Sequence, residues 1–289
     1  MVGDVTVVPN SITGLAEYAY AADTGGNVYR ITIGPNLPAN WTITKIASLG
    51  CNTTNCPGGV ANRKFMFAPE VVVAPDYNII LIGSGDREHP LLSNTTTTSV
   101  DNAFFMVKDK PSDAAWWSSE AANCESQALA CITSLLSIDP DSTLLPTDEQ
   151  LAAKKGWYMP FGAGDHDKEQ VVTSAIAVLG VVTFSTHTPT PTDSNSCGSN
   201  LGLARVYNLG FLNGEPSSGT TRYVPIKGDG LPPSPVAGLV TVVHPVTGQN
   251  ITVPFIIGSS PDSPLEGASP QAIATPSSAK TRAYWYLQQ

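Results

Sequence analysis

A strand–turn–strand unit recurs four times along this chain and limits the folds that it can adopt. Each unit pairs an apolar strand with a second strand rich in β-branched and aromatic residues, which strands prefer. The units occupy, in order, residues 4–49, 67–109, 171–215 and 235–288. Their spacing of roughly 60 to 80 residues is typical of repeat architectures that carry insertions.

The first unit shows the pattern most clearly. Residues 18–33 read YAYAADTGGNVYRITI, in which an apolar strand is followed by a turn at Gly25, Gly26 and Asn27 and by a second strand. Glycine and asparagine tolerate the positive φ that a tight hairpin turn requires. The stretch therefore predicts an antiparallel hairpin.

Small antiparallel sheets repeated in this way are typical of a β-propeller. Each sheet, or blade, stacks its apolar faces on its neighbours, and the ring leaves few free strand edges. We predict an all-β fold: a β-propeller with four or so blades of a larger ring. A pair of sheets forming a β-sandwich is the alternative, because alternating strands alone do not separate the two folds.

One stretch departs from the β pattern. Residues 113–156 are rich in Ala, Leu, Gln and Glu, which favour helix. Thr147 and Gln150 have the spacing of a capping box, and Gly156 is placed to end a helix. We predict a helical insertion over residues 113–156, lying on one rim of the propeller.

Composition and charge exclude several classes of function. Charged residues make up 13% of the 289 residues, the net charge is −9, and no basic run is present. Nucleic-acid binding and attraction to an anionic membrane therefore have no electrostatic basis. We expect no membrane insertion, because no stretch of about 18 apolar residues occurs.

The residue usage is typical of exported proteins, yet the first ten residues, MVGDVTVVPN, do not resemble a signal peptide. Such a leader has a basic start and an apolar core. We expect that the chain is a fragment of an exported protein or the product of a truncated reading frame.

Four of the five cysteines form two close pairs, Cys51 with Cys56 and Cys124 with Cys131. We predict two local disulfides, each closing a loop, in an oxidising compartment such as the periplasm or the cell surface. Free thiols in a reducing compartment are the alternative, and zinc is disfavoured because neither pair has a two-residue gap or a histidine nearby. Cys197 has either a partner outside this segment or a free thiol.

Two polar clusters are candidate sites. The first, GSGDREHP at residues 83–90, could hold a metal or act in acid–base chemistry, but the simpler interpretation is that Arg87 pairs with a neighbouring carboxylate. The second reads GDHDKE, residues 164–169, and its candidate cation ligands are Asp165, His166 and Asp167. A solvated turn is the simpler interpretation there. The sequence has no G-x-S-x-G elbow and no phosphate-binding glycine loop, so neither of these catalytic motifs is available.

The loop ahead of the first hairpin is a candidate calcium site. A Ca²⁺ loop places oxygen ligands at alternate positions around a glycine turn. With Gly14 as the turn, the candidate ligands are Ser11, Thr13 and Glu17. One carboxylate is too little charge for tight binding, so calcium is at most a weak ligand, and no other cofactor is expected.

Four stretches, taken in order, resemble one known family. They are YAADTGGNVYRI (20–31), GSGDREHPL (83–91), GWYMPF (156–161) with EQVVTSAIAVLGVVTFST (169–186), and TRAYWYL (281–287). The first is similar to the YAGD-x-x-GN-x-(W/Y)R blade signature of the PilY/PilC family of type IV pilus tip adhesins and biogenesis factors. The resemblance spans residues 4–287.

The resemblance implies that residues 1–289 are the C-terminal part of a PilY-like, seven-bladed-like propeller in a larger exported protein. It implies a non-enzymatic role at the pilus tip, in adhesion, pilus biogenesis and twitching motility. The implied partners are minor pilins, a host or abiotic surface, and the N-terminal part of the same protein, at a cell surface reached through the periplasm and outer membrane.

Members of this family often carry an acidic calcium loop, D-x-D-x-D-G-x-x-D, just before the matching strand. Here Gly14 is kept, while Pro9, Ser11, Thr13 and Glu17 stand at the ligand positions. Calcium control of pilus extension and retraction is therefore in doubt for this chain.

Two other functions remain as alternatives. One is a quinone-dependent dehydrogenase propeller, although the vicinal cysteine pair and the Trp-rich repeat ending of that class are missing. The other is a carbohydrate-binding propeller with Trp116, Trp117 or Trp157 as sugar platforms. These tryptophans could instead pack the insertion onto the blades.

Overall fold

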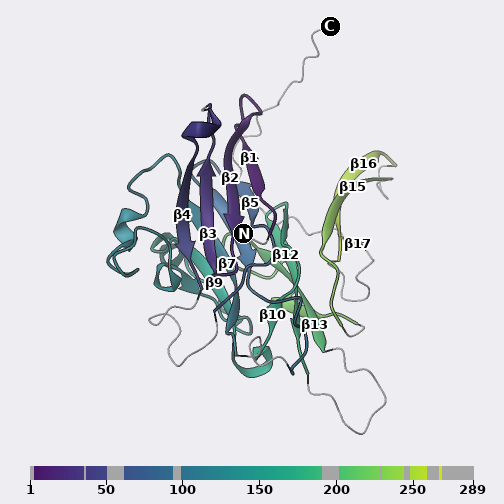
Figure 1. The fold of residues 1–289 in the computed structure, drawn as a ribbon. Helices are drawn as coiled ribbons and strands as arrows, with labels where there is room; N and C mark the ends of the chain where they lie inside the picture. The colour runs from purple at the N-terminus through teal and green to yellow at the C-terminus, as the bar shows by residue number, and fades with distance from the viewer. Residues whose placement is uncertain are drawn as a thin grey trace.

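The computed structural model describes residues 3–35, 37–50, 62–93, 99–190, 202–227, 230–243, 248–258 and 267–268. Its regular structure is mostly β-strand, arranged in four sheets that we call A to D (Figure 1). The sheets follow the order of the four units predicted from the sequence. The all-β prediction is confirmed.

The strands of each sheet have the following bounds. Sheet A contains β1 (Thr6–Pro9), β2 (Ala16–Ala22), β3 (Asn27–Thr32) and β4 (Thr42–Ser48). Sheet B contains β5 (Glu70–Val73), β6 (Asn78–Gly83), β7 (Asn102–Asp109), β9 (Gly156–Phe161) and β8 (Leu136–Ser137). Sheet C contains β10 (Gln170–Val171), β11 (Ile176–Val178), β12 (Val181–Thr188), β13 (Leu203–Gly210) and β14 (Tyr223–Pro225). Sheet D contains β15 (Val236–Val243), β16 (Asn250–Ile257) and β17 (Gly267–Ala268).

The predicted hairpin is the β2–β3 pair of sheet A. Asp23 organises its turn, because one carboxylate oxygen accepts hydrogen bonds from the backbone N–H groups of Gly25 and Asn27, both at 2.9 Å. Gly26 has φ +75°, and a Cβ there would lie 2.4 Å from the backbone of Gly50. Glycine is therefore required at this position both by conformation and by space.

Sheet B is buried on both faces, which distinguishes blade packing from a two-sheet sandwich. Along β6, Ile80 and Ile82 join the core shared with sheet A, while Ile79 and Leu81 join the core shared with sheet C. The residues of β7 alternate in the same way. In a sandwich each sheet buries one face, so the sandwich alternative is wrong.

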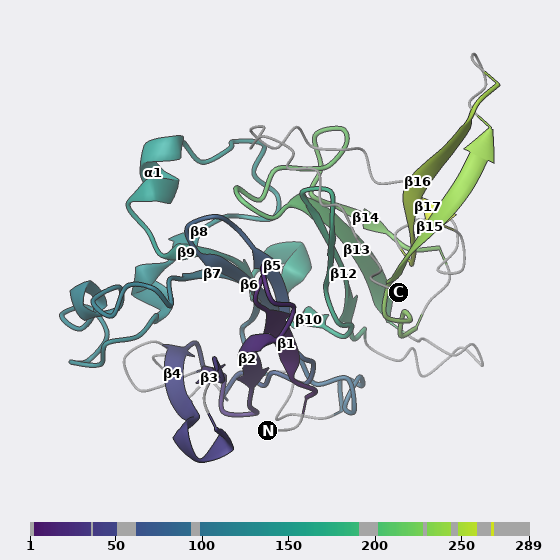
Figure 2. The same ribbon diagram turned by 90° about the horizontal axis from the view of Figure 1, so that it is seen from above.

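The sheets are arranged as successive blades, with A, B and C beside one another and D at the end (Figure 2). Strand β5 contacts both β1 and β11, and β11 contacts β15. Each of these strands is the first or second of its sheet along the chain. Every sheet therefore presents its early strands to the neighbouring sheets, as blades do around a central axis. The β-propeller prediction is confirmed for these four sheets.

Sheets B and C are joined by a stack of three aromatic rings. Phe104 of β7 stacks on Phe184 of β12 with ring centroids 3.9 Å apart, and Phe184 stacks on Tyr207 of β13 at 4.8 Å. All three side chains are fully buried. The stack lies in the core shared by sheets B and C and sets how these two blades pack against each other.

The prediction of a helical insertion over residues 113–156 is wrong for most of its length. The described backbone there contains two 3₁₀ turns, η2 (Ser118–Glu120) and η3 (Ile132–Ser134), and one short helix, α1 (Asp148–Ala152). Glu125 and Ser126 have positive φ, which interrupts a helix. The segment lies along the outer strands rather than on a rim, since Ala130 pairs with Ala47 of β4.

The predicted capping box is confirmed at the start of α1. Thr147 Oγ1 accepts a hydrogen bond from the backbone of Gln150 at 3.3 Å, and the Gln150 side chain accepts one from the backbone of Thr147 at 2.9 Å. Gly156 does not end this helix but begins β9, where a Cβ would lie 1.9 Å from the Met106 carbonyl oxygen. Among the described residues, no helix is long and apolar enough to cross a membrane.

Candidate functional site

The densest buried polar cluster lies on sheet C around the carboxylate of Glu169. This side chain is fully buried, and it accepts hydrogen bonds from Arg205 Nη1 at 2.7 Å, from the Tyr207 hydroxyl at 2.9 Å and from Thr186. A buried carboxylate needs this many donors to offset the loss of hydration. Strands β12 and β13 supply all three.

His166 connects this cluster to the insertion. Its Nδ1 lies 2.5 Å from Glu169 Oε2, and its Nε2 lies 3.2 Å from Asp141 Oδ1. Burial by itself lowers the pKa of His166, but the hydrogen bonds and charges of Glu169 and Asp141 outweigh burial, and the pKa is raised above 6.5. As an imidazolium, His166 donates from both ring nitrogens to two carboxylates.

The solvated turn predicted for residues 164–169 is wrong for two of its side chains. Asp165 and Asp167 are exposed, as expected, but His166 and Glu169 are buried. In the part of the chain that the structure describes, no three His, Cys, Asp or Glu side chains are grouped as a metal site. Glu169 is not among the residues predicted from the sequence, although Arg205, a lone cation in the apolar strand LARVYNLG, indicates a buried acidic partner.

A cavity of about 620 Å³ opens beside this cluster. His166 lies in its wall, Tyr158 of β9 contributes from sheet B, and Arg63 contributes from the segment before β5. Three exposed carboxylates also line it, those of Asp101, Asp139 and Asp141. Both nitrogens of His166 face carboxylates, so the arrangement holds segments of the chain together rather than presenting a free base.

The polar cluster at residues 83–90 joins sheets B and C. Burial raises the pKa of Asp86, but hydrogen bonds and charges from Lys64 at 2.6 Å and His89 at 3.0 Å outweigh it, and the net shift is downward. The prediction that Arg87 pairs with a neighbouring carboxylate is wrong. Arg87 instead donates to the carbonyl oxygens of Val172 at 2.5 Å and Pro232 at 2.8 Å.

The candidate calcium ligands Ser11, Thr13 and Glu17 lie in and just after the turn that joins β1 to β2. Asn10 organises this turn, because its Oδ1 accepts hydrogen bonds from the backbone of Ile12 and of Thr13, both at 3.0 Å. Glu17 accepts a hydrogen bond from the Asn10 side chain at 3.0 Å. We keep the prediction that this turn binds Ca²⁺ weakly or not at all.

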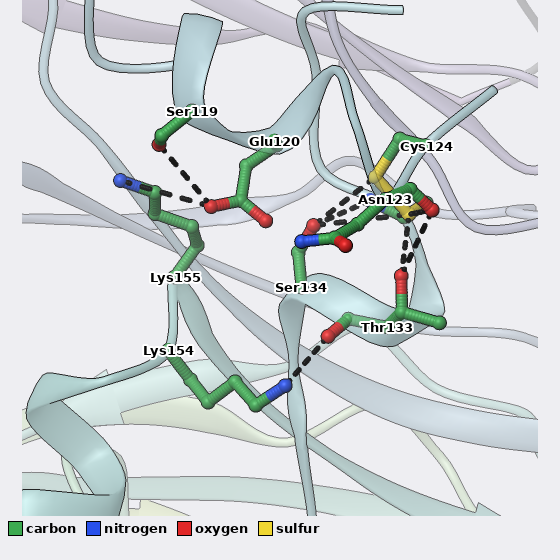
Figure 3. Close-up of a disulfide and its surroundings, with 9 residues drawn as sticks. Ser119, Glu120, Asn123, Cys124, Thr133, Ser134, Lys154 and Lys155 are labelled. Carbon is green, nitrogen blue, oxygen red and sulfur yellow. Dashed lines mark hydrogen bonds and ion pairs between the residues drawn. A yellow bond between two sulfur atoms is a disulfide. The ribbon is translucent and has the colours of Figure 1, made fainter. Parts of the chain in front are cut away.

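A disulfide joins Cys124 and Cys131, as the sequence predicts (Figure 3). The residues on either side of the loop that it closes are fastened to the segment before β9, because Lys154 donates to the Thr133 carbonyl at 2.7 Å and Lys155 lies 3.9 Å from Glu120. The disulfide thereby anchors a segment that has little regular structure. The predicted pair Cys51–Cys56, and Cys197, lie outside the described residues.

The three candidate sugar platforms are all engaged in packing. Trp157 is fully buried, and Trp117 is 7% exposed. Trp116 is half-buried, and the ammonium of Lys155 lies over its ring, 3.6 Å from the ring centroid. These side chains pack within the structure, and the carbohydrate alternative loses the platforms on which it depended.

A second buried carboxylate, Asp109, links sheets A and B with the insertion. It accepts hydrogen bonds from Arg30 of β3 at 2.8 Å, from the Tyr20 hydroxyl of β2 at 2.7 Å and from the Trp117 indole at 3.2 Å. Asp109 itself ends β7. The Asp109 side chain therefore links sheet A, sheet B and the insertion.

No protein-family model matches the chain, and no curated protein matches it. A solved structure does: the crystal structure of the Pseudomonas aeruginosa PilY1 C-terminal domain matches with a TM-score of 0.53 and 16% sequence identity, over 87% of this chain. The chain shares its fold with the PilY1 C-terminal domain. It spans 57% of the length of that structure.

The likeness to PilY1 agrees with the resemblance carried by the sequence stretches. The first stretch is the β2–β3 hairpin, the second follows β6, and the third contains β9 to β12. The fourth, residues 281–287, lies outside the described residues. At 16% identity the likeness to PilY1 establishes the fold and nothing finer.

Proposed function

We propose that the chain is a non-enzymatic module of the type IV pilus that acts at the pilus tip in pilus biogenesis, surface attachment and twitching motility. The observation that carries the proposal is the fold shared with the PilY1 C-terminal domain over 87% of the chain. The sequence stretches that resemble the PilY/PilC family, found in family order, add support from an independent source.

The proposed location is the cell surface, reached through the periplasm and outer membrane. The Cys124–Cys131 disulfide supports this location, because such bonds persist in oxidising compartments. The proposed partners are minor pilins, a host or abiotic surface, and the N-terminal part of the same protein. The net charge of −9 argues against nucleic acid as a partner.

We also propose that the four sheets are part of a larger ring. The face of sheet A turned away from sheet B carries an apolar row across all four strands, formed by Val7, Ala19, Ile31 and Ile43. Val7 is 54% exposed and Ile43 is 65% exposed. A further blade would cover this row as sheets A and C cover the two faces of sheet B.

The test is deletion of the gene in its source bacterium, with complementation by the wild-type gene. We expect the deletion to reduce the amount of surface pili, the attachment of cells and the twitching zone, and complementation to restore all three. Immunogold labelling of an epitope-tagged protein should mark pilus tips. Unchanged piliation, attachment and twitching would contradict the proposal.

A further inference from the structure

Residues 139–145, which we call the 139–145 segment, leave sheet B after β8 and are tied to sheet C by buried cationic side chains. Arg222 is 2% exposed, and its guanidinium donates to the carbonyl oxygens of Asp139 at 3.3 Å, of Leu144 at 3.1 Å and of Ser142. Arginine stays charged throughout the accessible pH range. The charge in this tie therefore does not change with pH.

The second tie is different, because its cation titrates. His166 Nε2 lies 3.2 Å from Asp141 Oδ1, and the Tyr223 hydroxyl of β14 donates to the same oxygen at 2.9 Å. An imidazolium has two N–H groups, whereas a neutral imidazole has one. Loss of the proton leaves His166 with a single donor for two carboxylates.

We infer that the 139–145 segment is a latch between sheets B and C, and that its Asp141 end is released when His166 loses its proton. The remaining N–H stays with Glu169, since that carboxylate is fully buried and its contact with Nδ1 is the shorter one, at 2.5 Å. The exposed carboxylate of Asp141 then faces a ring nitrogen without a hydrogen. That contact is repulsive, and water can hydrate Asp141 instead.

The groups around His166 come from every element packed against it. Glu169 and Asp141 favour its charged form, and Arg205 opposes it through its own charge. The Tyr207 hydroxyl lies 3.3 Å from Nδ1, and the rings of Phe161 and Tyr223 pack against the imidazole. The remaining ionisable neighbours on its own turn are the exposed Asp165 and Asp167 and the half-buried Lys168.

The sign of the pH dependence follows from the upward shift of the His166 pKa in the closed latch. Release removes the contribution of Asp141 but leaves that of Glu169, so the pKa of His166 is lower in the open latch than in the closed one. Below the pKa of the open latch, His166 is protonated in both forms, and the closed form has its full stability. As pH rises from there to the pKa of the closed latch, the closed form weakens by up to about tenfold per pH unit. Above that pKa it remains at its weakest.

The latch also controls the wall of the cavity. Asp139, Asp141 and His166 line the cavity of about 620 Å³. Release of Asp141 changes the position of one of its carboxylates and exposes the imidazole. The shape and charge of this cavity therefore depend on pH, whatever binds there.

The test is hydrogen exchange of the backbone amides of the 139–145 segment, corrected for intrinsic rates, from about pH 5 to about pH 9. The amides of Asp141, Ser142 and Leu144 report on the closed form, because each donates a hydrogen bond within the segment. We expect their protection to fall as pH rises, with a midpoint that matches the titration of His166 followed by NMR in the same protein.

Two variants and a control separate the latch from a general effect of pH. His166→Gln and Asp141→Asn should each flatten the pH profile, while His89→Gln, which changes a histidine of the separate Asp86 ion pair, should keep it. Protection that is independent of pH in the wild type overturns the inference. So does a midpoint that differs from the His166 titration, a measurement that needs no variant to fold.

Discussion

In the turn between β2 and β3, glycine is required at position 26 for two reasons, its backbone conformation and the space around it. Gly26 has φ +75°, a region that other residues enter at a cost, and its Cα faces the backbone of Gly50. Gly14, in the turn between β1 and β2, has a similar φ of +69°, but a Cβ there would meet nothing within 4 Å. A comparison of Gly26 with Gly14 therefore separates the energetic cost of a positive φ from that of steric overlap with a neighbouring backbone.

Gly26→Ala should therefore destabilise the protein more than Gly14→Ala. We expect Gly14→Ala to lower the free energy of unfolding by about 1 kcal/mol, and Gly26→Ala by at least twice as much, because the backbone of Gly50 must also move. Denaturant unfolding of both variants measures the difference. Equal losses would show that the backbone around Gly50 yields without cost.

The turn between β1 and β2 also allows a test of the calcium prediction. We expect weak or undetectable Ca²⁺ binding by the wild type in calorimetry, since Glu17 is the one carboxylate among the candidate ligands. The double variant Ser11→Asp/Thr13→Asp should bind at least about tenfold more tightly, because added ligand charge raises affinity. Adding Glu17→Gln to it should reverse the gain. Tight binding by the wild type would contradict the prediction.

Among the elements, the insertion between β7 and β9 shows how a segment with little regular structure is held in place. Three 3₁₀ or helical turns are joined by loops, and the Cys124–Cys131 disulfide closes one of these loops. Trp117 and Leu135 bury their side chains in the core shared by sheets A and B. The insertion is anchored at a few points rather than by a continuous apolar face.

Replacing both cysteines, Cys124→Ser/Cys131→Ser, should loosen the insertion without unfolding the sheets. A disulfide that closes a loop this short contributes about 2.5 kcal/mol. We expect faster proteolysis within residues 113–137 and a smaller free energy of unfolding, with the β-sheet circular dichroism unchanged. Cys197→Ser is the control for loss of a cysteine. Unchanged proteolysis in the double variant would show that the other anchors suffice.

Across the whole molecule, sheet B is the centre of the structure. Its two faces supply the cores shared with sheets A and C, and its strand β7 ends in Asp109, which accepts hydrogen bonds from sheet A and from the insertion. Stability of the blades is therefore coupled through this sheet, and the fold should unfold cooperatively.

Asp109→Asn tests that coupling. The change keeps the shape of the side chain but leaves Arg30, 14% exposed, without its charged partner. We expect the free energy of unfolding to fall by about 3 kcal/mol, the cost of removing one member of a buried pair. Asp76→Asn, at an exposed turn position, is the control and should change stability by less than about 0.5 kcal/mol. A loss as small as that of the control would contradict the proposed link.

The strands, their turns and one disulfide could be predicted from the sequence. The β2–β3 hairpin, the capping box at Thr147 and the Cys124–Cys131 pair are all local, so neighbouring residues along the chain carry the information. The repeat of four units could be predicted as well, because each unit repeats the same local pattern.

In contrast, the sheet faces that are shared and the charges that meet depend on the tertiary structure. The helix-favouring residues of 113–137 form turns, since intrinsic propensity is weak beside packing and a disulfide. His166 lies 25 residues from Asp141, and Arg205 lies 36 residues from Glu169. No local pattern links residues so far apart. Burial brings them together, because a charge removed from water must find its partner wherever the fold places one.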